Sequence, residues 1–368
     1  MGKKVVMLLL LVILAASGII IVKPAFASSD AENSWVSKAP LNVAMSGLGA
    51  AVVNGRIYAI GGYALNATGG YGLNGIIGTN EEYDAATDTW TNKTSMPTPR
   101  YDFAIATYNN KIYCIGGFLP DGSTTGINEA YDPSTDTWQT RMPMPTNRAE
   151  MNANDVNGRI YVIGGRTGGP YSTVNITEVY DPVSDSWTQG ESMPYPLVSY
   201  ASAVVDNKIY VIGGQDEFRS DMNVAFNQIY DPQTDNWSQG APIPVPTLAA
   251  AGATTGLVAP KRIYVIGGSA GFGEGSNQNY VYDTQANVWT NATLMPTARY
   301  TPAVAVVNDQ LYVIGGGDAM TVLTTNEQYT PIGFGTIPEF PSTITFVFTA
   351  LMAATLIMGI IYRRKSKR

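Results

Sequence analysis

Short apolar segments alternate with polar turns through the middle of the chain, and the pattern repeats about every 50 residues. In the second repeat, two strand-like segments, Phe103–Tyr108 and Lys111–Gly116, are joined by Asn109-Asn110. Two further segments follow at Ile127–Asp132 and Thr137–Thr140. Asn, Asp and Gly tolerate the positive φ angles of tight hairpin turns. Each repeat is therefore predicted to form four antiparallel strands.

The same residue types return at the same places in every repeat. A Gly-Gly pair ends the second strand at Gly61-Gly62, Gly116-Gly117, Gly164-Gly165, Gly213-Gly214, Gly267-Gly268 and Gly315-Gly316. The third strand carries Tyr83, Tyr131, Tyr180, Tyr230, Tyr282 and Tyr329. The fourth strand carries Trp90, Trp138, Trp187, Trp237 and Trp289. A sixth tryptophan, Trp35, precedes the first Gly-Gly pair.

The order of these residues predicts how the repeats close. The last repeat has Tyr329 but no tryptophan after it, whereas Trp35 has no repeat before it. We therefore predict that Ser34–Lys38 pairs beside Asn326–Thr330 as the outer strand of the last sheet. Such pairing would remove two open sheet edges. The alternative is an open solenoid with exposed edges.

Gly-Gly, the spaced tyrosines, the tryptophan and a trailing Met-Pro together resemble the kelch repeat, over about 300 residues. The resemblance implies an all-β fold, a six-bladed kelch-type β-propeller. Physical reasoning agrees, because a lone four-stranded sheet exposes both faces. A radial arrangement buries these faces against one another, with Trp and Tyr filling the gaps. Residues 28–336 are assigned to this domain.

The N-terminal segment has the layout of a secretory signal. Lys3 and Lys4 precede the apolar run Val5–Val22, and Ala25-Phe26-Ala27 offers small residues for cleavage. We therefore predict a signal peptide over residues 1–27. The alternative is a retained membrane helix.

The C-terminal segment has the layout of a membrane anchor. An uncharged apolar run, Thr345–Tyr362, precedes a basic tail, which predicts a transmembrane segment over 343–362 and a cytoplasmic tail over 363–368. Pro338-Glu339-Phe340, within residues 337–342, precedes that segment. This arrangement resembles archaeal Pro-Glu-Phe sorting signals and implies a sorting enzyme as partner. The alternative is a plain anchor with a proline-containing stalk.

Composition excludes several kinds of chemistry. The chain has no histidine, which removes Ser-His-Asp catalysis and imidazole metal sites. The kelch-containing copper oxidases, which need two histidines, are excluded for the same reason. Between the two terminal segments, 14 basic residues face 28 acidic ones, so the outer domain is near −14 and poorly suited to nucleic acid. We expect no cofactor and no metal, and the single Cys114 is expected to be buried.

Export would make Asn-x-Ser/Thr sequons available for glycosylation. The middle region holds five of them, at Asn66, Asn92, Asn175, Asn236 and Asn291.

The kelch resemblance implies that ligands bind at the loops of one face. One loop set has a recurring position three residues after a proline, occupied by Val43, Arg100, Arg148, Leu197, Thr247 and Arg299. Tyr101, Asp102, Glu150, Tyr200 and Tyr300 lie close by in sequence. Arginine binds carboxylates and tyrosine stacks on sugars, so this rim predicts a carboxylate-bearing glycan or acidic peptide. The alternative is that the arginines are structural and bound to local acids or backbone.

The second loop set follows the Gly-Gly pairs and is uneven in length. Its longest member is Tyr63–Thr79, and Gln215–Asn223 carries Asp216, Glu217 and Asp221. Variable loops on a rigid scaffold often carry function. The spacing of these acids matches no calcium loop, and a solvated acidic loop is the simpler interpretation.

Two functions fit these features. The first is a cell-surface recognition module, membrane-anchored with the propeller outside, that binds a glycan or protein. The second is a sugar-processing enzyme, because some exported six-bladed kelch proteins are sialic acid mutarotases and this chain is similar in blade number and export. Glu150 or Glu217 would then act as base, with the rim arginines on the sugar carboxylate. We expect binding rather than catalysis, and a mutarotase or epimerase if it is an enzyme.

Overall fold

The computed structural model describes residues 31–64, 75–219, 222–271, 274–318 and 321–335. The chain divides into two units, and all strands lie in the second, Glu32–Arg368. These strands form six four-stranded antiparallel sheets, and the described residues contain no α-helix. The prediction of an all-β, six-bladed propeller is confirmed.

Each blade is one sheet, numbered here along the chain. Blade 1 contains β2 (Gly49–Val53), β3 (Arg56–Ile60), β4 (Asn80–Asp84) and β5 (Thr89–Lys93). Blade 2 contains β6 (Ala104–Tyr108), β7 (Lys111–Ile115), β8 (Asn128–Asp132) and β9 (Thr137–Arg141). Blade 3 contains β10 (Asn152–Val156), β11 (Arg159–Ile163), β12 (Thr177–Asp181) and β13 (Ser186–Gly190).

Blade 4 contains β14 (Ala201–Val205), β15 (Lys208–Ile212), β16 (Asn227–Asp231) and β17 (Asn236–Gln239). Blade 5 contains β18 (Ala251–Thr254), β19 (Ile263–Ile266), β20 (Asn279–Asp283) and β21 (Val288–Asn291). Blade 6 contains β22 (Ala303–Val307), β23 (Gln310–Ile314), β24 (Asn326–Thr330) and β1 (Ser34–Lys38). In the second repeat these bounds lie within one residue of the prediction.

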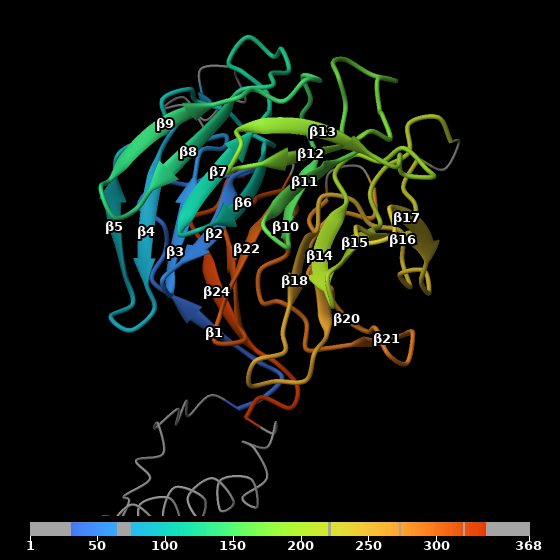
Figure 1. Cartoon of the computed structure of the whole chain (residues 1–368). Helices are drawn as coiled ribbons and strands as arrows, with labels where there is room; N and C mark the ends of the chain where they lie inside the picture. Colours follow the sequence, from blue (N-terminus) through green and yellow to red (C-terminus); the bar gives the residue numbers. More distant parts are fainter. Residues whose placement is uncertain (1–30, 65–74, 220–221, 272–273, 319–320, 336–368) are drawn as a thin grey trace, which may run out of the picture. The chain divides into compact units, whose positions relative to one another are not determined.

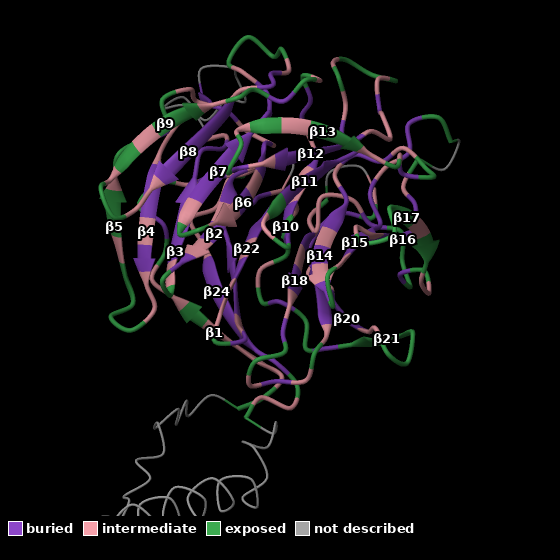
Figure 2. Ribbon diagram, in the orientation of Figure 1, coloured by how far each residue is buried: buried purple, intermediate pink, exposed green. Residues whose placement is uncertain are grey.

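The first strand of each blade lies at the centre of the propeller and the last at its rim (Figure 1). Each inner strand contacts the inner strand of the next blade, and β22 contacts β2, so the six blades close into a ring. Burial follows this order (Figure 2): the second and third strands are largely buried, whereas the outer strands are largely exposed. The core therefore consists of apolar layers between neighbouring blades.

The first strand of the chain closes the last blade. β1 pairs antiparallel with β24, with Trp35 opposite Tyr329 and Lys38 opposite Asn326. The predicted pairing of Ser34–Lys38 with Asn326–Thr330 is confirmed in both position and partner. An open solenoid is excluded.

The hairpin turns between the first two strands have the expected backbone. Asn54 and Gly55 have φ angles of 51° and 74°, and Asn109 and Asn110 have 47° and 59°. At the other end of the second strand, Gly62 has a φ of 102°, and a Cβ there would lie 2.9 Å from the carbonyl oxygen of Ser46. Glycine is therefore required for both conformation and space.

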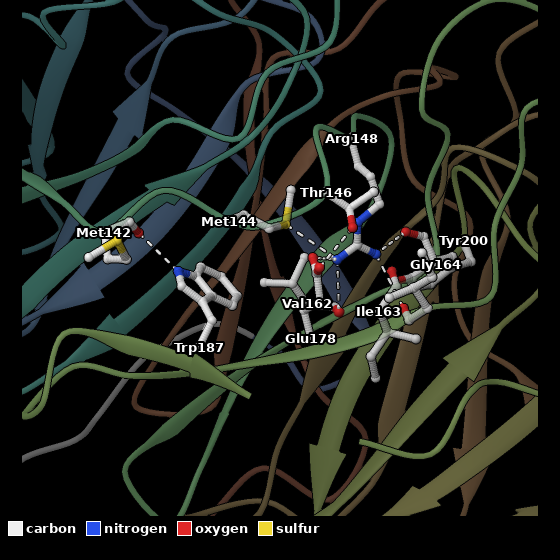
Figure 3. Close-up of polar contacts among 11 residues, drawn as sticks. Met142, Met144, Thr146, Arg148, Val162, Ile163, Gly164, Glu178, Trp187 and Tyr200 are labelled. Atoms are coloured by element: carbon white, nitrogen blue, oxygen red, sulfur yellow. Dashed lines mark hydrogen bonds and ion pairs between the residues drawn. The ribbon is translucent and has the colours of Figure 1, made fainter. Parts of the chain in front are cut away.

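A repeated set of contacts fastens each blade to the one before it, and Figure 3 shows one of them, the hydrogen bond from Trp187 of blade 3 to Met142. The ring of Trp187 packs on Tyr180 with centroids 5.0 Å apart, and its Nε1 donates to the Met142 carbonyl at 2.9 Å. The Tyr180 hydroxyl donates to Asp185, which also accepts the Met142 amide at 2.8 Å. Equivalent tryptophan contacts occur in all six blades, with Trp35 donating to Thr293 across the closure.

Both ends of the described chain lie at one face, which we call the hairpin face because the turns between first and second strands lie there. The Asn33 amide donates to the Thr330 carbonyl at 2.8 Å, and the Gly333 amide donates to Glu32 at 2.7 Å. We call the opposite face, where the inner strands begin, the loop face.

Several sequence predictions fall outside the described residues. These are the signal peptide (1–27), the Pro-Glu-Phe segment (337–342), the transmembrane segment (343–362) and the basic tail (363–368), which remain predictions. Within the described ranges, no helix has the length and apolar character needed to span a bilayer. Cys114 is buried as predicted.

Candidate binding site on the loop face

Six residues, one per blade, form a closed ring of backbone hydrogen bonds where the inner strands begin. We call Gly47, Asp102, Glu150, Ser199, Ala249 and Thr301 the axial ring. Each amide donates to the preceding member's carbonyl at 2.6–3.3 Å, and the Gly47 amide closes the ring on Thr301. All six have φ between 49° and 61°. A cavity of about 100 Å³ is lined by all six members, so the axial ring surrounds the mouth of the central channel.

A larger cavity of about 420 Å³ lies beside the axial ring, between blades 6, 1 and 2. We call it the Tyr pocket, lined by Ser46, Gly47, Tyr63, Ile76, Tyr101, Asp102, Tyr300, Thr301, Asp318, Thr321 and Val322. Tyr63 follows the Gly-Gly pair of blade 1, whereas Tyr101 and Tyr300 lie in the segments that enter blades 2 and 6. Three separate segments thus each contribute one tyrosine.

Short backbone bridges hold these tyrosines in place. Tyr63 pairs with Ser46 and Ile76, Tyr101 with Phe118, and Tyr300 with Gly317. The Tyr101 ring also stacks on Phe118 with centroids 5.0 Å apart. The pocket walls are therefore fixed by the scaffold rather than by free loops.

The Asp102 carboxyl lies against Gly47 and faces the Tyr pocket. A Cβ on Gly47 would come within 2.5 Å of Oδ1 of Asp102, so only glycine leaves room for this carboxyl. No hydrogen bond to the carboxyl is found among the described residues. Burial raises the pKa of Asp102 to about 8, the nearby Glu150 acts in the same direction, and Arg166 opposes both.

Glu150 belongs to a charge cluster next to the Tyr pocket. Nη2 of Arg166 lies 2.9 Å from Oε2 of Glu150 and 3.4 Å from Oε1 of Glu217. Ser199 donates to Glu150 at 3.2 Å, and Thr173 donates to Glu217. Burial also raises the pKa of Glu150. One cation is thus shared by two carboxylates.

A third cavity, of about 570 Å³, adjoins this cluster. Tyr101, Phe118, Glu150 and Arg166 line it together with the glycine-containing loops of blades 2 and 3. Tyr101 lines both this cavity and the Tyr pocket. The loop face therefore carries two neighbouring recesses, and the Tyr101 side chain lies between them.

The three arginines do not line the rim, and that expectation is corrected. Arg100, Arg148 and Arg299 are fully buried, and each guanidinium contacts a glutamate of its own blade. In blade 3, Arg148 also donates to the Gly164 carbonyl at 2.5 Å (Figure 3). It donates to the Ile176 carbonyl at 3.2 Å as well. The alternative interpretation, structural arginines bound to acids and backbone, describes them correctly.

Tyr200 is also buried and cannot stack on a ligand at the rim. Its hydroxyl donates to the Ile163 carbonyl at 2.5 Å and accepts the Asn152 amide at 3.2 Å. The structure thus divides the predicted rim residues. It brings Tyr101, Asp102 and Tyr300 together in the Tyr pocket, with Glu150 beside it, and places the arginines and Tyr200 inside the blades.

Sequence reasoning gave no individual role to Tyr63, Arg166 and Asp318. Tyr63 and Arg166 directly follow a Gly-Gly pair, and Asp318 lies one residue further on. The second strand of each blade ends at the loop face, so the residues just after its Gly-Gly pair lie at the site. The position after each pair was the signal that would have found them.

The remaining predicted positions are more dispersed. Asn92, Asn236 and Asn291 are exposed on outer strands. The Asn175 side chain is instead engaged, because its Nδ2 donates to the Met193 carbonyl at 2.9 Å. Asn66 and Asp221 lie outside the described residues. Asp216 and Glu217 are buried rather than solvated, which corrects the interpretation of that loop. In the described part of the chain, no group of acidic or cysteine side chains is arranged to hold a metal ion.

Comparison with known proteins places these features in context. The sequence profile of the KLHDC2/KLHL20/DRC7 Kelch-repeats domain matches residues 47–247 and 199–330. The F-box/kelch-repeat protein At1g67480 of Arabidopsis thaliana is 34% identical over 85 residues, which are 23% of this chain and 21% of that protein. The influenza virus NS1A-binding protein homolog of Xenopus laevis is 38% identical over 78 residues, 21% of this chain and 11% of that protein.

The solved structure of YjhT is similar in fold. It superposes with a TM-score of 0.65 over 78% of this chain and 95% of that chain, at 17% sequence identity. This likeness concerns the fold alone. The relatives by sequence share only a fraction of their own length with this chain, so their activities do not transfer directly.

Proposed function

Because this chain belongs to the kelch-repeat family, we propose that it is a recognition module, exported and anchored at the cell surface, that binds a glycan or protein ligand at its loop face. The observation that carries the proposal is the Tyr pocket, where Tyr63, Tyr101 and Tyr300 from three segments face one cavity of about 420 Å³. A cavity of this size, with aromatic walls and a few polar groups, is typical of ligand sites.

The pocket residues suit recognition chemically. Tyrosine offers a large apolar face and a polar tip, which serves a sugar ring or a peptide side chain equally well. The pocket lining also contains polar groups: the hydroxyls of Ser46 and Thr301, which hydrogen-bond to each other, the Thr321 hydroxyl and the Asp102 carboxyl. A rigid propeller that positions these groups limits the entropy lost on binding.

The path of the chain supports a tethered module. Residues Glu32 and Gly333 contact each other at the hairpin face, opposite the Tyr pocket. The predicted anchor follows Gly335 in sequence. A tether that begins at the hairpin face leaves the loop face open to a ligand.

Arrays of glycans and peptides, probed with the full chain in detergent, test this proposal. Tyr101→Ala and Tyr300→Ala should each abolish binding to the ligands retained by the natural protein. Tyr171→Ala is the matched control, because Tyr171 is 70% exposed on a blade 3 loop and does not line the pocket. Binding that survives both pocket substitutions would overturn the proposal.

A second candidate is acid–base chemistry on a bound sugar. Asp102 and Glu150 are neighbours in the axial ring, and both carboxyls have raised pKa values. The burial of the three arginines removes the group assigned to a sugar carboxylate, which weakens this candidate. Proton NMR of anomer exchange in acidic and neutral sugars decides it: acceleration that Asp102→Asn removes would establish catalysis.

A further inference from the structure

We infer that the Tyr pocket receives a cationic group of the ligand, an ammonium or guanidinium, with Asp102 as its counter-ion and the tyrosine rings as its walls. The inference rests on the proposed function and names the chemical class of the ligand. It reverses the expectation of an acidic ligand.

The charges around the pocket are one-sided. Two carboxyl residues, Asp102 and Asp318, line it, and none of its described lining residues is basic. Arg100 and Arg299 precede pocket residues in sequence but turn into the blades, where Glu129 and Glu327 neutralise them. Arg166 is held by Glu150 and Glu217. A carboxylate ligand would therefore meet two acidic side chains and no basic one among the described lining residues, whereas a cationic ligand would meet acids that can ionise beside it.

The aromatic walls favour the same ligand class. The face of a tyrosine ring carries negative electrostatic potential, and a cation within about 6 Å of its centroid is attracted. The rings of Tyr63 and Tyr101 lie 6.3 Å apart at 60°, so they form two walls at an angle. Burial raises the pKa of Tyr101 to about 12, so the ring stays neutral. Tyr300 supplies a third wall from blade 6.

Arg166 supplies the positive charge that acts on the partly exposed Asp102 carboxyl. The titratable groups that act on it are Glu150 and Arg166 of blade 3 and the two pocket tyrosines Tyr101 and Tyr300. Arg166 is already shared by two glutamates. A cation bound in the pocket would supply a further positive charge and stabilise the ionised form. Binding near neutral pH would therefore release a proton from Asp102.

Two matched probe pairs test the inference with the full chain in detergent. Choline is paired with its neutral isostere 3,3-dimethylbutan-1-ol, and N-acetyl-lysine methylamide with N-acetyl-norleucine methylamide. Affinities come from calorimetry and from shifts of tyrosine ring protons. At least one cation should bind roughly tenfold more tightly than its neutral partner. At pH 7 its heat of binding should depend on the buffer, which reports the released proton.

Substitutions separate the charge from the cavity. Asp102→Asn should remove both the preference for the cation and the proton release. Asp155→Asn, which changes an exposed carboxyl at the other end of the channel, should leave both unchanged. Neutral probes that bind as tightly as the cations, and lose binding in Tyr101→Ala, would overturn the inference but leave the recognition site standing. If neither cation outbinds its partner, the inference fails, and the arrays alone decide the proposed function.

Discussion

Inside blade 3, Nη2 of Arg148 lies 2.7 Å from Oε2 of Glu178, and the arginine side chain is wholly shielded from solvent (Figure 3). Blades 2 and 6 repeat the pair as Arg100 with Glu129 and Arg299 with Glu327. Blade 4 has Leu197 and Gln228 at the corresponding positions. Blade 1 keeps the acid as Glu81 but has Val43 at the arginine position, and the Glu81 carboxylate accepts the backbone amides of Asn42 and Val43 instead.

Removing one member of this pair should be strongly destabilising. Arg148→Leu leaves the Glu178 carboxylate buried without its partner, and we expect a loss of about 3–5 kcal/mol in the free energy of unfolding. The double variant Arg148→Leu/Glu178→Gln copies blade 4 and should recover most of that loss. Urea unfolding of the three proteins measures both effects. A double variant as unstable as the single one would show that the pair is not the cause.

The sequence predicted the closure of the ring better than the direction of the arginines. Closure followed from counting, because one tryptophan was missing after Tyr329 and one was extra at Trp35. Burial of Arg148 depends on Glu178, which lies 30 residues later in the sequence. Which side of its strand the Glu178 side chain occupies is known only from the assembled blade. The number and spacing of the arginines do not show whether their side chains point to solvent or into the blade. Tyr101 and Tyr300 were found because each follows directly after such an arginine.

Titration of Asp102 should make stability depend on pH. Its pKa is raised in the folded chain, so the folded state keeps a proton that the unfolded state loses. Stability should therefore fall as pH rises from about 4, the ordinary aspartate value, through about 8. Asp102→Asn removes this loss, so its melting temperature relative to the natural protein should rise with pH, by about 2 °C or more at pH 9.

Asp121→Asn serves as the control for this measurement. Asp121 is exposed, and its hydrogen bonds with Ser123 lower its pKa. This variant should show no gain in relative stability at high pH. Thermal scans of the three proteins between pH 4 and pH 9 make the comparison. Equal behaviour of Asp102→Asn and Asp121→Asn would show that Asp102 is not held in the protonated form.

Closure through β1 predicts that Trp35 matters beyond its own contacts. Its ring packs on Tyr329 with centroids 4.9 Å apart, and Nε1 donates to Thr293 at 2.9 Å. Trp35→Ala should release β1 and expose the edge of β24. Trp138→Ala removes matching contacts in blade 2, where the outer strand continues the same chain segment.

Hydrogen exchange distinguishes these two tryptophans. Trp35→Ala should lower the protection of backbone amides in Asn326–Thr330, because no hairpin joins their partner strand β1 to β24. Trp138→Ala should lower overall stability by about 3 kcal/mol while leaving the β8 amides protected until global unfolding. Similar local exchange in both variants would mean that the closing strand is no weaker than the other outer strands.

Asp309 fastens an irregular loop of the neighbouring blade and offers a last prediction. Blade 5 has no two-residue hairpin, and the chain from Thr255 to Arg262 instead folds over the Asp309 carboxylate. This carboxylate accepts the amides of Gly256, Leu257, Val258 and Ala259 at 2.6–3.1 Å. Hydrogen bonds to a charged acceptor contribute about 1.5–3 kcal/mol each where they are well shielded.

Asp309→Asn keeps a side chain that tolerates its φ of 60°, so it tests the charge alone. We expect faster proteolysis within residues 255–262 and a loss of about 2 kcal/mol in stability. Asn207→Ser alters the matching turn position of blade 4, where no such loop is bound, and should leave cleavage of residues 255–262 unchanged. Unchanged cleavage in Asp309→Asn as well would show that the carboxylate does not hold the loop. The Gly335 amide donates to the Val258 carbonyl at 2.7 Å, so a released loop should also loosen the point where the chain leaves the propeller.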